Sequence, residues 1–189
     1  MLHSLGRKTI ASVTDLTPMG ALLECHERIR AFMRLGARLA EVQGASAAEV
    51  EETAGKVVRY FTLAFPMHEK DEEESVMPRL KNRAPNLSAL ITKLEGEHRA
   101  LDVLIEELIA ITQRLAEKGD RLPSEREPLA RVITQLDTGF NAHFNVEEEV
   151  VLGAMRAHLT EEDLSSITAE MQERRVQALT RQSQGGHDV

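Results

Sequence analysis

Four long segments of this chain repeat apolar residues at spacings of three and four, and this period restricts the fold more than any other feature. The segments span residues 18–42, 46–82, 87–118 and 124–158, and the connections between them are short. Each segment therefore forms an amphipathic helix whose apolar face must be buried against other helices. We predict an all-α fold, an up-down-up-down antiparallel four-helix bundle with a short fifth C-terminal helix.

Capping signals set the starts of several helices. Thr17-Pro18 offers a capping hydroxyl followed by proline at the first helical position. Ser46 with Glu49, and Ser124 with Glu127, each have the spacing of a capping box, so we expect the second and fourth helices to begin there.

A proline and a further capping residue show where the second helix is interrupted and where the fifth helix begins. Pro66 interrupts the second helix and predicts a kink just before His68. Thr160 precedes three acidic residues and predicts the start of the fifth helix. We divide the chain into an N-terminal arm (1–16), the bundle (17–158), a C-terminal helix (159–181) and a disordered tail (182–189).

One histidine lies on the apolar stripe of each bundle helix. Two of them are followed four residues later by a glutamate, which places both side chains on the same face of the helix. These six residues are His26, His68, Glu72, His98, His143 and Glu147.

Distances from the loops show whether these side chains can meet, because residues equally far from a hairpin loop lie level with each other. At about 1.5 Å per residue, His68 and His98 lie at one depth across their shared loop, and so do His98 and His143. His26 matches His68 less closely, by one to two turns.

Imidazole nitrogens and carboxylate oxygens together suit iron, manganese or zinc. Glutamates buried without a counter-charge would each cost several kcal/mol, so the pattern favours a pair of metal ions held by all six residues and bridged by Glu72 and Glu147. The remaining coordination positions would be open to O₂, NO or peroxide. A dry environment is expected from Phe61, Phe65, Phe140 and Phe144.

Other side chains near these positions are expected to have supporting roles or none. Glu69 and Asp71 are candidate partners for ring N–H groups, while the acidic run 69–74 is otherwise expected to be solvated. Cys25 is interpreted as a small packing residue. No role is assigned to His3, His158 or His187.

Composition excludes several classes of protein. The net charge of −8 argues against a nucleic-acid or anionic-membrane partner. Cys25 is the single cysteine, so no intrachain disulfide can form. No 18-residue apolar run and no signal-peptide pattern are found, so we expect a cytoplasmic location and no membrane span.

Taken together, four motifs resemble those of the hemerythrin-like (HHE cation-binding) family. They are Cys25-His26-Glu27-Arg28, His68-x-x-x-Glu72-Glu73-Glu74, Glu97-His98 and His143-x-x-x-Glu147-Glu148-Glu149. The resemblance implies a four-helix bundle around a non-haem di-iron centre with the six ligands above. Asp102 stands where oxygen-carrying hemerythrins have a fifth histidine, which argues against reversible oxygen carriage. The set of four histidines and two glutamates is more similar to iron-centre repair proteins of the same superfamily.

The functional expectation is a protein that binds two iron ions, with zinc or manganese as alternatives, and that binds or senses O₂, NO or peroxide or handles iron. One alternative is an enzyme that reduces NO or peroxide at the same centre. Another is an interaction module whose metal is structural. The oligomeric state stays open, with a homodimer as one option, and no protein partner is indicated.

Overall fold

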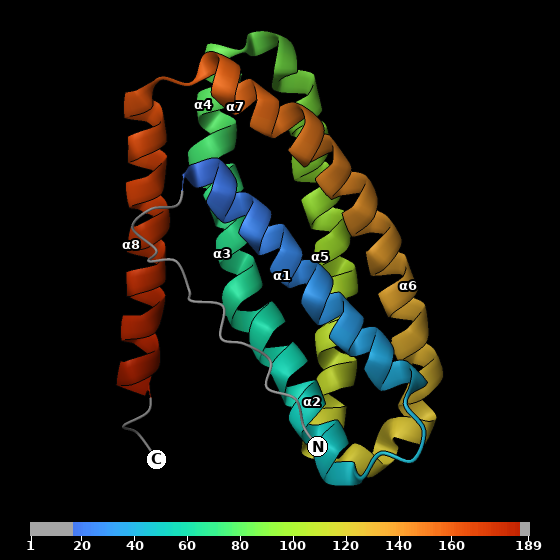
Figure 1. Cartoon of the computed structure of the whole chain (residues 1–189). Helices are drawn as coiled ribbons and strands as arrows, with labels where there is room; N and C mark the ends of the chain where they lie inside the picture. Colours follow the sequence, from blue (N-terminus) through green and yellow to red (C-terminus); the bar gives the residue numbers. More distant parts are fainter. Residues whose placement is uncertain (1–16, 186–189) are drawn as a thin grey trace, which may run out of the picture.

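The computed structural model describes residues 17–185, with side chains up to residue 180. Four antiparallel helices form an up-down-up-down bundle, which confirms the predicted fold (Figure 1).

The first bundle helix is α1 (Pro18–Glu41) and the third is α5 (Ser88–Glu117). The second comprises α2 (Ala47–Arg59), η2 (Tyr60–Ala64), α3 (Phe65–Lys70), η3 (Asp71–Val76) and α4 (Met77–Arg83). The fourth comprises α6 (Leu122–Val146), η6 (Glu147–Val151) and α7 (Leu152–His158). Short 3₁₀ turns, η4 (Pro85–Leu87) and η5 (Gly119–Arg121), connect the second to the third and the third to the fourth.

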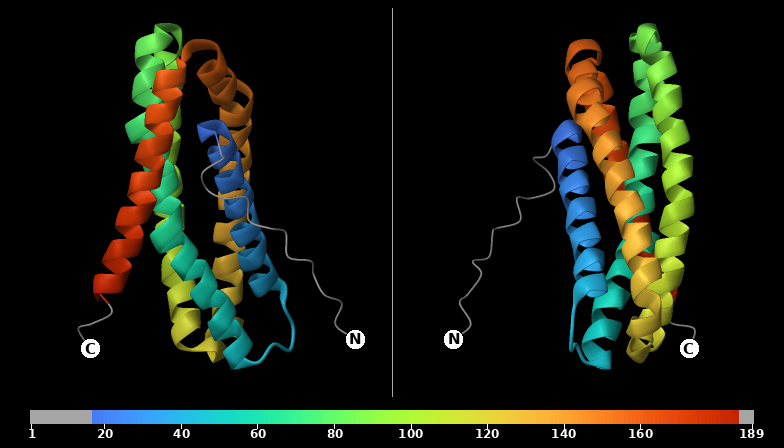
Figure 2. Two further views of the ribbon diagram at one scale, coloured as in Figure 1. Left: turned by 60° about the vertical axis from the view of Figure 1, so that its left-hand side comes forward. Right: turned by 90° about the vertical axis from the view of Figure 1, so that its right-hand side faces the viewer.

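A further helix, α8 (Glu161–Gly185), follows the bundle and lies along the second bundle helix (Figure 2). The Thr160 hydroxyl accepts a hydrogen bond from the Asp163 N–H at 3.1 Å, so the predicted cap is confirmed. The helix is longer than predicted, because residues 182–185 are helical rather than part of a tail. The predicted arm (1–16) and residues 186–189 lie outside the described residues.

Two of the other predicted caps are present and one is wrong. Thr17 accepts from the Gly20 N–H, and Ser46 with Glu49 forms the complete capping box. The Ser124 hydroxyl instead donates to the Arg121 carbonyl at 2.8 Å. Helix α6 has already begun at Leu122, because the 3₁₀ turn η5 leads into it without a break.

Three π-helical segments, η2, η3 and η6, interrupt the second and fourth bundle helices. Pro66 and Pro78 each lie in the first turn of the α-helix that follows a π segment. Each π segment closes with a bond five residues back, such as Phe65 N–H to the Tyr60 carbonyl. The sequence thus predicts an interruption at Pro66, and the structure gives it the form of a π segment in a chain that stays helical.

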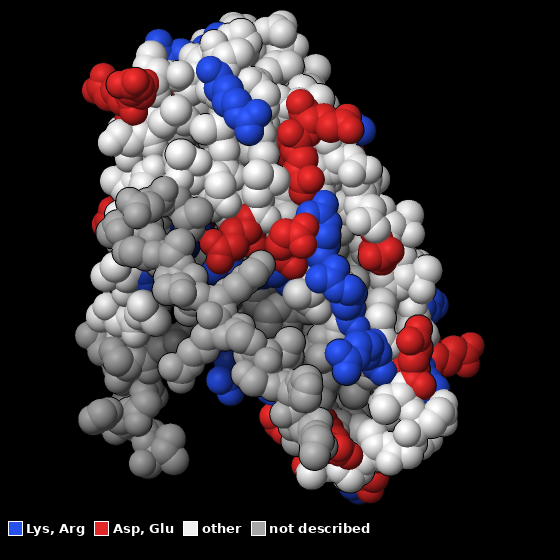
Figure 3. Space-filling view, in the orientation of Figure 1, with Lys and Arg blue, Asp and Glu red and all other residues white. Residues whose placement is uncertain are grey.

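Charged side chains of both signs follow one another along α1. Glu24 and Glu27 pair with Arg28 and Arg30, Arg34 and Arg38 come next, and Glu41 ends the helix. Figure 3 shows the resulting line of basic side chains beside acidic ones on this face.

Two apolar clusters fill the bundle and leave a polar layer between them. The larger cluster lies below the layer in the view of Figure 1 and joins α1, α2, α5 and α6. It includes Ile29, Leu108 and Phe144. The smaller lies above and includes Leu22, Met77 and residues of α8. Within residues 17–185, no helix is long and apolar enough to cross a membrane.

Candidate metal centre

The polar layer contains the six residues predicted as metal ligands, one or two from each bundle helix. None is more than 4% exposed: His26 0%, His68 3%, Glu72 3%, His98 4%, His143 2% and Glu147 2%. The sequence placed His26 out of register by one to two turns, yet its ring centroid lies 5.0 Å from that of His68. All six side chains are therefore brought to one depth.

The ligand atoms form two overlapping groups of four, and the atoms of each group lie within 4.8 Å of one another. One group takes its imidazoles from His26 and His68, and the other takes them from His98 and His143. Glu72 and Glu147 belong to both groups. Two histidines and two shared carboxylates for each position match the donor set that a pair of carboxylate-bridged ions requires.

Distances across the layer show how the carboxylates link the two groups. The Glu147 carboxylate lies 3.0 Å from His143 Nε2 through Oε1 and 3.3 Å from His26 Nε2 through Oε2. Glu72 Oε2 lies 3.4 Å from His98 Nε2 and 3.7 Å from His68 Nε2. Each carboxylate therefore faces one imidazole of each group.

Several of these buried atoms have no hydrogen-bond partner among the described residues. They are His26 Nε2, Glu72 Oε2 and both carboxylate oxygens of Glu147. A buried polar atom left unsatisfied costs about 1–3 kcal/mol, and ligation would satisfy all of these atoms together. The residues present thus fit a pair of metal ions.

Carboxylates outside the layer fix the orientation of three imidazole rings. The His26 Nδ1 lies 2.9 Å from Glu148, the His98 Nδ1 lies 2.8 Å from Glu73, and the His143 Nδ1 lies 2.9 Å from Glu97. With Nδ1–H donating to a carboxylate, each ring turns the Nε2 lone pair toward the centre.

These three glutamates were missed at the sequence level, although each directly follows or precedes a ligand in the chain. Each glutamate contacts a histidine on a helix other than its own, and this pairing becomes visible only once the helices are packed. The prediction that Asp71 would support a ring is wrong, because this carboxylate pairs with two arginines of α8. The His68 Nδ1 has no hydrogen-bond partner in the described structure.

The environment sets the protonation of the donors. Burial raises the pKa of Glu72, but His68, His26 and His98 outweigh it and hold that pKa well below its usual range. Burial keeps the pKa of His68 low. Burial also lowers the pKa of His26, yet Glu147 and Glu72 outweigh it and raise the value to about 10.

An aromatic shell covers the side of the layer that faces the larger cluster. Phe144 stacks on His26 with 4.2 Å between ring centroids, and Phe65 lies 6.2 Å from His68. Phe140 and Phe61 lie behind Phe65, and all four phenylalanines are buried. The predicted apolar surroundings are present.

Glu69 and Asp102 form a second, separate pair of carboxyl groups beside His98. Burial raises the pKa of Glu69 to about 8, and the charge of Asp102 adds to the shift. Glu95 turns away to Lys81 at 2.6 Å, and His158 is exposed, so neither takes part in the centre. His3 and His187 lie outside the described residues.

Comparison with known proteins agrees with this geometry. The model of the hemerythrin HHE cation binding domain matches residues 17–124, more than half of the chain. This match ends before His143 and Glu147, which the structure adds from the fourth bundle helix. An uncharacterised protein of Haemophilus influenzae is 28% identical over 159 aligned residues, covering 69% of this chain and 92% of its own length.

Proposed function

Because this chain belongs to the hemerythrin HHE cation-binding domain family, we propose that it binds two iron ions in the polar layer and uses them to bind or sense a small oxidant such as O₂, NO or peroxide. Handling of iron itself is a related use of the same centre. The proposal depends mainly on one observation: two groups of four donor atoms share Glu72 and Glu147.

The donor count supports a centre that also accepts an external ligand. Each group offers four protein atoms, fewer than an octahedral ion takes. When bound, iron would supply Lewis acidity and one-electron chemistry at this position. The protein contributes the shared carboxylates, the oriented imidazoles and a shell that excludes water.

The aromatic shell supports a small apolar ligand over a large polar one. Phe144 and Phe65 contact the histidines from the larger cluster, so any ligand on that side meets rings rather than water. The absence of a fifth histidine at Asp102 favours a sensing or oxidant-binding use over reversible oxygen carriage.

Metal content with an absorption spectrum tests the proposal first. We expect about two irons per chain, in line with the two donor groups, and near-ultraviolet absorption of an oxo-bridged pair after oxidation. Protein loaded anaerobically with ferrous iron is then exposed to O₂, NO or peroxide, and the spectral change identifies the ligand.

Other outcomes lead to the two alternative functions. Zinc alone, or no iron after anaerobic loading, contradicts the proposal and moves the function to a structural metal or an interaction module. Sustained consumption of NO or peroxide with an added reductant would make the chain an enzyme.

A further inference from the structure

The C-terminal helix α8 contacts the bundle at the segment that presents a shared ligand. Asp71 lies beside Glu72 in η3, and its side chain is 0% exposed. Both of its carboxylate oxygens are taken by α8: Arg174 Nη1 lies 2.8 Å from Oδ1, and Arg175 Nη2 lies 2.7 Å from Oδ2. We call Asp71, Arg174 and Arg175 the clasp.

The clasp extends over the surrounding turn of η3. Arg174 also donates to the Ser75 hydroxyl at 2.6 Å and pairs with Glu74 at 3.2 Å. Arg79 adds a bidentate pair with Glu170 of α8, at 2.6 and 3.1 Å, and donates to the Ser75 carbonyl. Charged groups of α8 therefore hold the π segment at the residue that directly precedes Glu72 in the chain.

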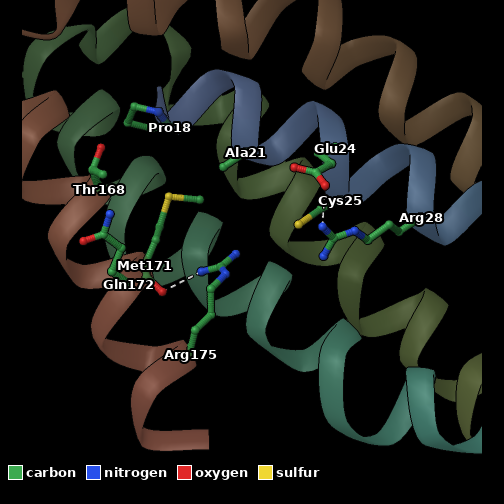
Figure 4. Close-up of a pocket in the computed structure, with 9 residues that line it drawn as sticks. All are labelled: Pro18, Ala21, Glu24, Cys25, Arg28, Thr168, Met171, Gln172 and Arg175. Carbon is green, nitrogen blue, oxygen red and sulfur yellow. Dashed lines mark hydrogen bonds and ion pairs between the residues drawn. The ribbon is translucent and has the colours of Figure 1, made fainter. Parts of the chain in front are cut away.

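Arg175 also joins α8 to the first bundle helix. Figure 4 shows Arg175 of α8 and Cys25 of α1 lining one pocket, together with Met171 and Gln172 of α8. Cys25 lies next to His26 in the chain, and Arg175 donates to the Asp71 carboxylate as well as to the Met171 carbonyl of its own helix. One arginine thus contacts the sequence neighbour of Glu72 and shares a pocket with the sequence neighbour of His26.

The backbone hydrogen bonding of η3 explains why its contact with α8 can affect the position of Glu72. A π segment is closed by a bond five residues back in place of the regular bonds of the α-helix around it, and in η3 the contacts of Asp71 and Ser75 with α8 add to this bond. We propose that Arg174 and Arg175 are positioning residues: by holding Asp71 they fix η3 so that Glu72 reaches both donor groups, and docking of α8 is thereby coupled to metal binding. This inference rests on the proposed function.

Coupling between two sites is reciprocal in free energy. If docking of α8 favours metal binding, metal must favour docking of α8 to the same extent. The inference therefore predicts two effects, one in variants and one in the unaltered protein.

The variant experiment compares R174A/R175A with wild type by competition for ferrous iron against a chromophoric chelator under argon. We expect the iron affinity to fall about 10–100-fold, the range for losing a group that orients a ligand. R174K/R175K, which keeps the charges, should recover part of the affinity. Arg83→Ala is the matched control, because it removes an α8 ion pair with Asp163 that does not touch η3.

The second experiment needs no substitution. Amide hydrogen exchange along residues 168–178 of α8 is measured in the metal-free and iron-loaded wild-type protein. We expect iron to slow exchange in α8 by a larger factor than in residues 103–117 of α5, which form the reference for stabilisation of the whole fold.

The outcomes separate this inference from the proposed function. If wild type binds no iron, both fail. If wild type binds iron, R174A/R175A binds it as tightly and α8 exchange is unchanged by iron, only the coupling fails. Lower thermal stability of metal-free R174A/R175A with unchanged iron affinity would show a purely structural role and also overturn it.

Discussion

At the scale of single residues, the two carboxylates and the four histidines have unequal parts in the centre. Glu72 and Glu147 belong to both donor groups, whereas each histidine belongs to one. Removing a carboxylate should therefore affect both metal positions, and removing a histidine should affect mainly one.

We predict that Glu147→Ala loses most of the bound metal and that His68→Ala keeps about one of the two ions. His158→Ala is the control, because this side chain is exposed at the end of α7 and should change neither metal content nor stability. Elemental analysis of the three variants after identical loading tests this. Equal metal content in all three would disprove the assignment of the site.

The glutamates behind the histidines give a second residue-scale prediction. Glu97 accepts from the His143 ring, so Glu97→Gln weakens the hold on that ring while leaving the helix intact. We expect the metal affinity to fall about 10–100-fold. Glu95→Gln, two residues earlier on α5, is the matched control because Glu95 pairs with Lys81. Competition with a chelator measures both, and equal affinities would contradict the role of Glu97.

The six ligand positions could be predicted from the sequence because helical period and loop position fix face and depth. The three supporting glutamates could not. Glu73, Glu97 and Glu148 contact histidines 25, 46 and 122 residues away in the chain, so their partners depend on how the helices pack. Glu73 and Glu148 lie in acidic runs, which are equally typical of a solvated face.

At the scale of elements, the π segments explain where the predicted apolar stripe fails. Counted at helical spacing from His143 and Glu147, the period predicts Val150 on the buried face, yet Val150 is 38% exposed and Val151 is 5% exposed. The wider turn of η6 shifts the buried face by one residue. A regular helical period cannot show this shift, because it assumes 3.6 residues per turn along the whole helix.

The loop between α5 and α6 gives an element-scale prediction. A Cβ on Gly119 would lie 2.1 Å from the Ala47 carbonyl oxygen, at the start of α2, and backbone cannot move aside easily. We expect Gly119→Ala to reduce the free energy of unfolding by about 1–3 kcal/mol, as overpacking does. Denaturant unfolding measures the change, while metal affinity should stay the same because the loop is remote from the centre.

Gly153→Ala is the matched control for this prediction. Its Cβ would meet nothing within 4 Å, and it lies in α7. Alanine should stabilise a helix interior by about 0.5–1 kcal/mol relative to glycine. Similar losses for both variants would contradict the close approach at Gly119.

At the scale of the whole molecule, the polar layer separates the two apolar clusters of the core and contains buried donor atoms without hydrogen-bond partners among the described residues. We predict that iron binding stabilises the fold by about 4 kcal/mol at a free metal concentration roughly 1,000 times Kd. For a chain of this size that corresponds to a rise in Tm of about 8–16 °C. Calorimetry of metal-free and loaded protein measures the shift, and Glu147→Ala should show little of it.

The bundle itself could be predicted, because four amphipathic segments with short connections leave few alternatives. The docking of α8 could not. Its contacts involve charged groups, such as Arg174 with Asp71, that look like ordinary surface residues in the sequence. Only the finished fold shows that this acidic side chain is buried.

The π segments also restrict how the gene for such a chain can change. Each contains one residue more than the α-helical turn it replaces, so deleting one codon within η3 would restore an α-helical turn and leave Met77 and Leu80 close to the face they now occupy. A deletion in the loop around Gly44 would likewise leave every ligand on its face, whereas one inside the regular helix α5 would rotate all residues on one side of it by about 100°. Among descendants of one ancestral gene, length should therefore vary at the loops and by single residues at the π segments, and stay constant within α5.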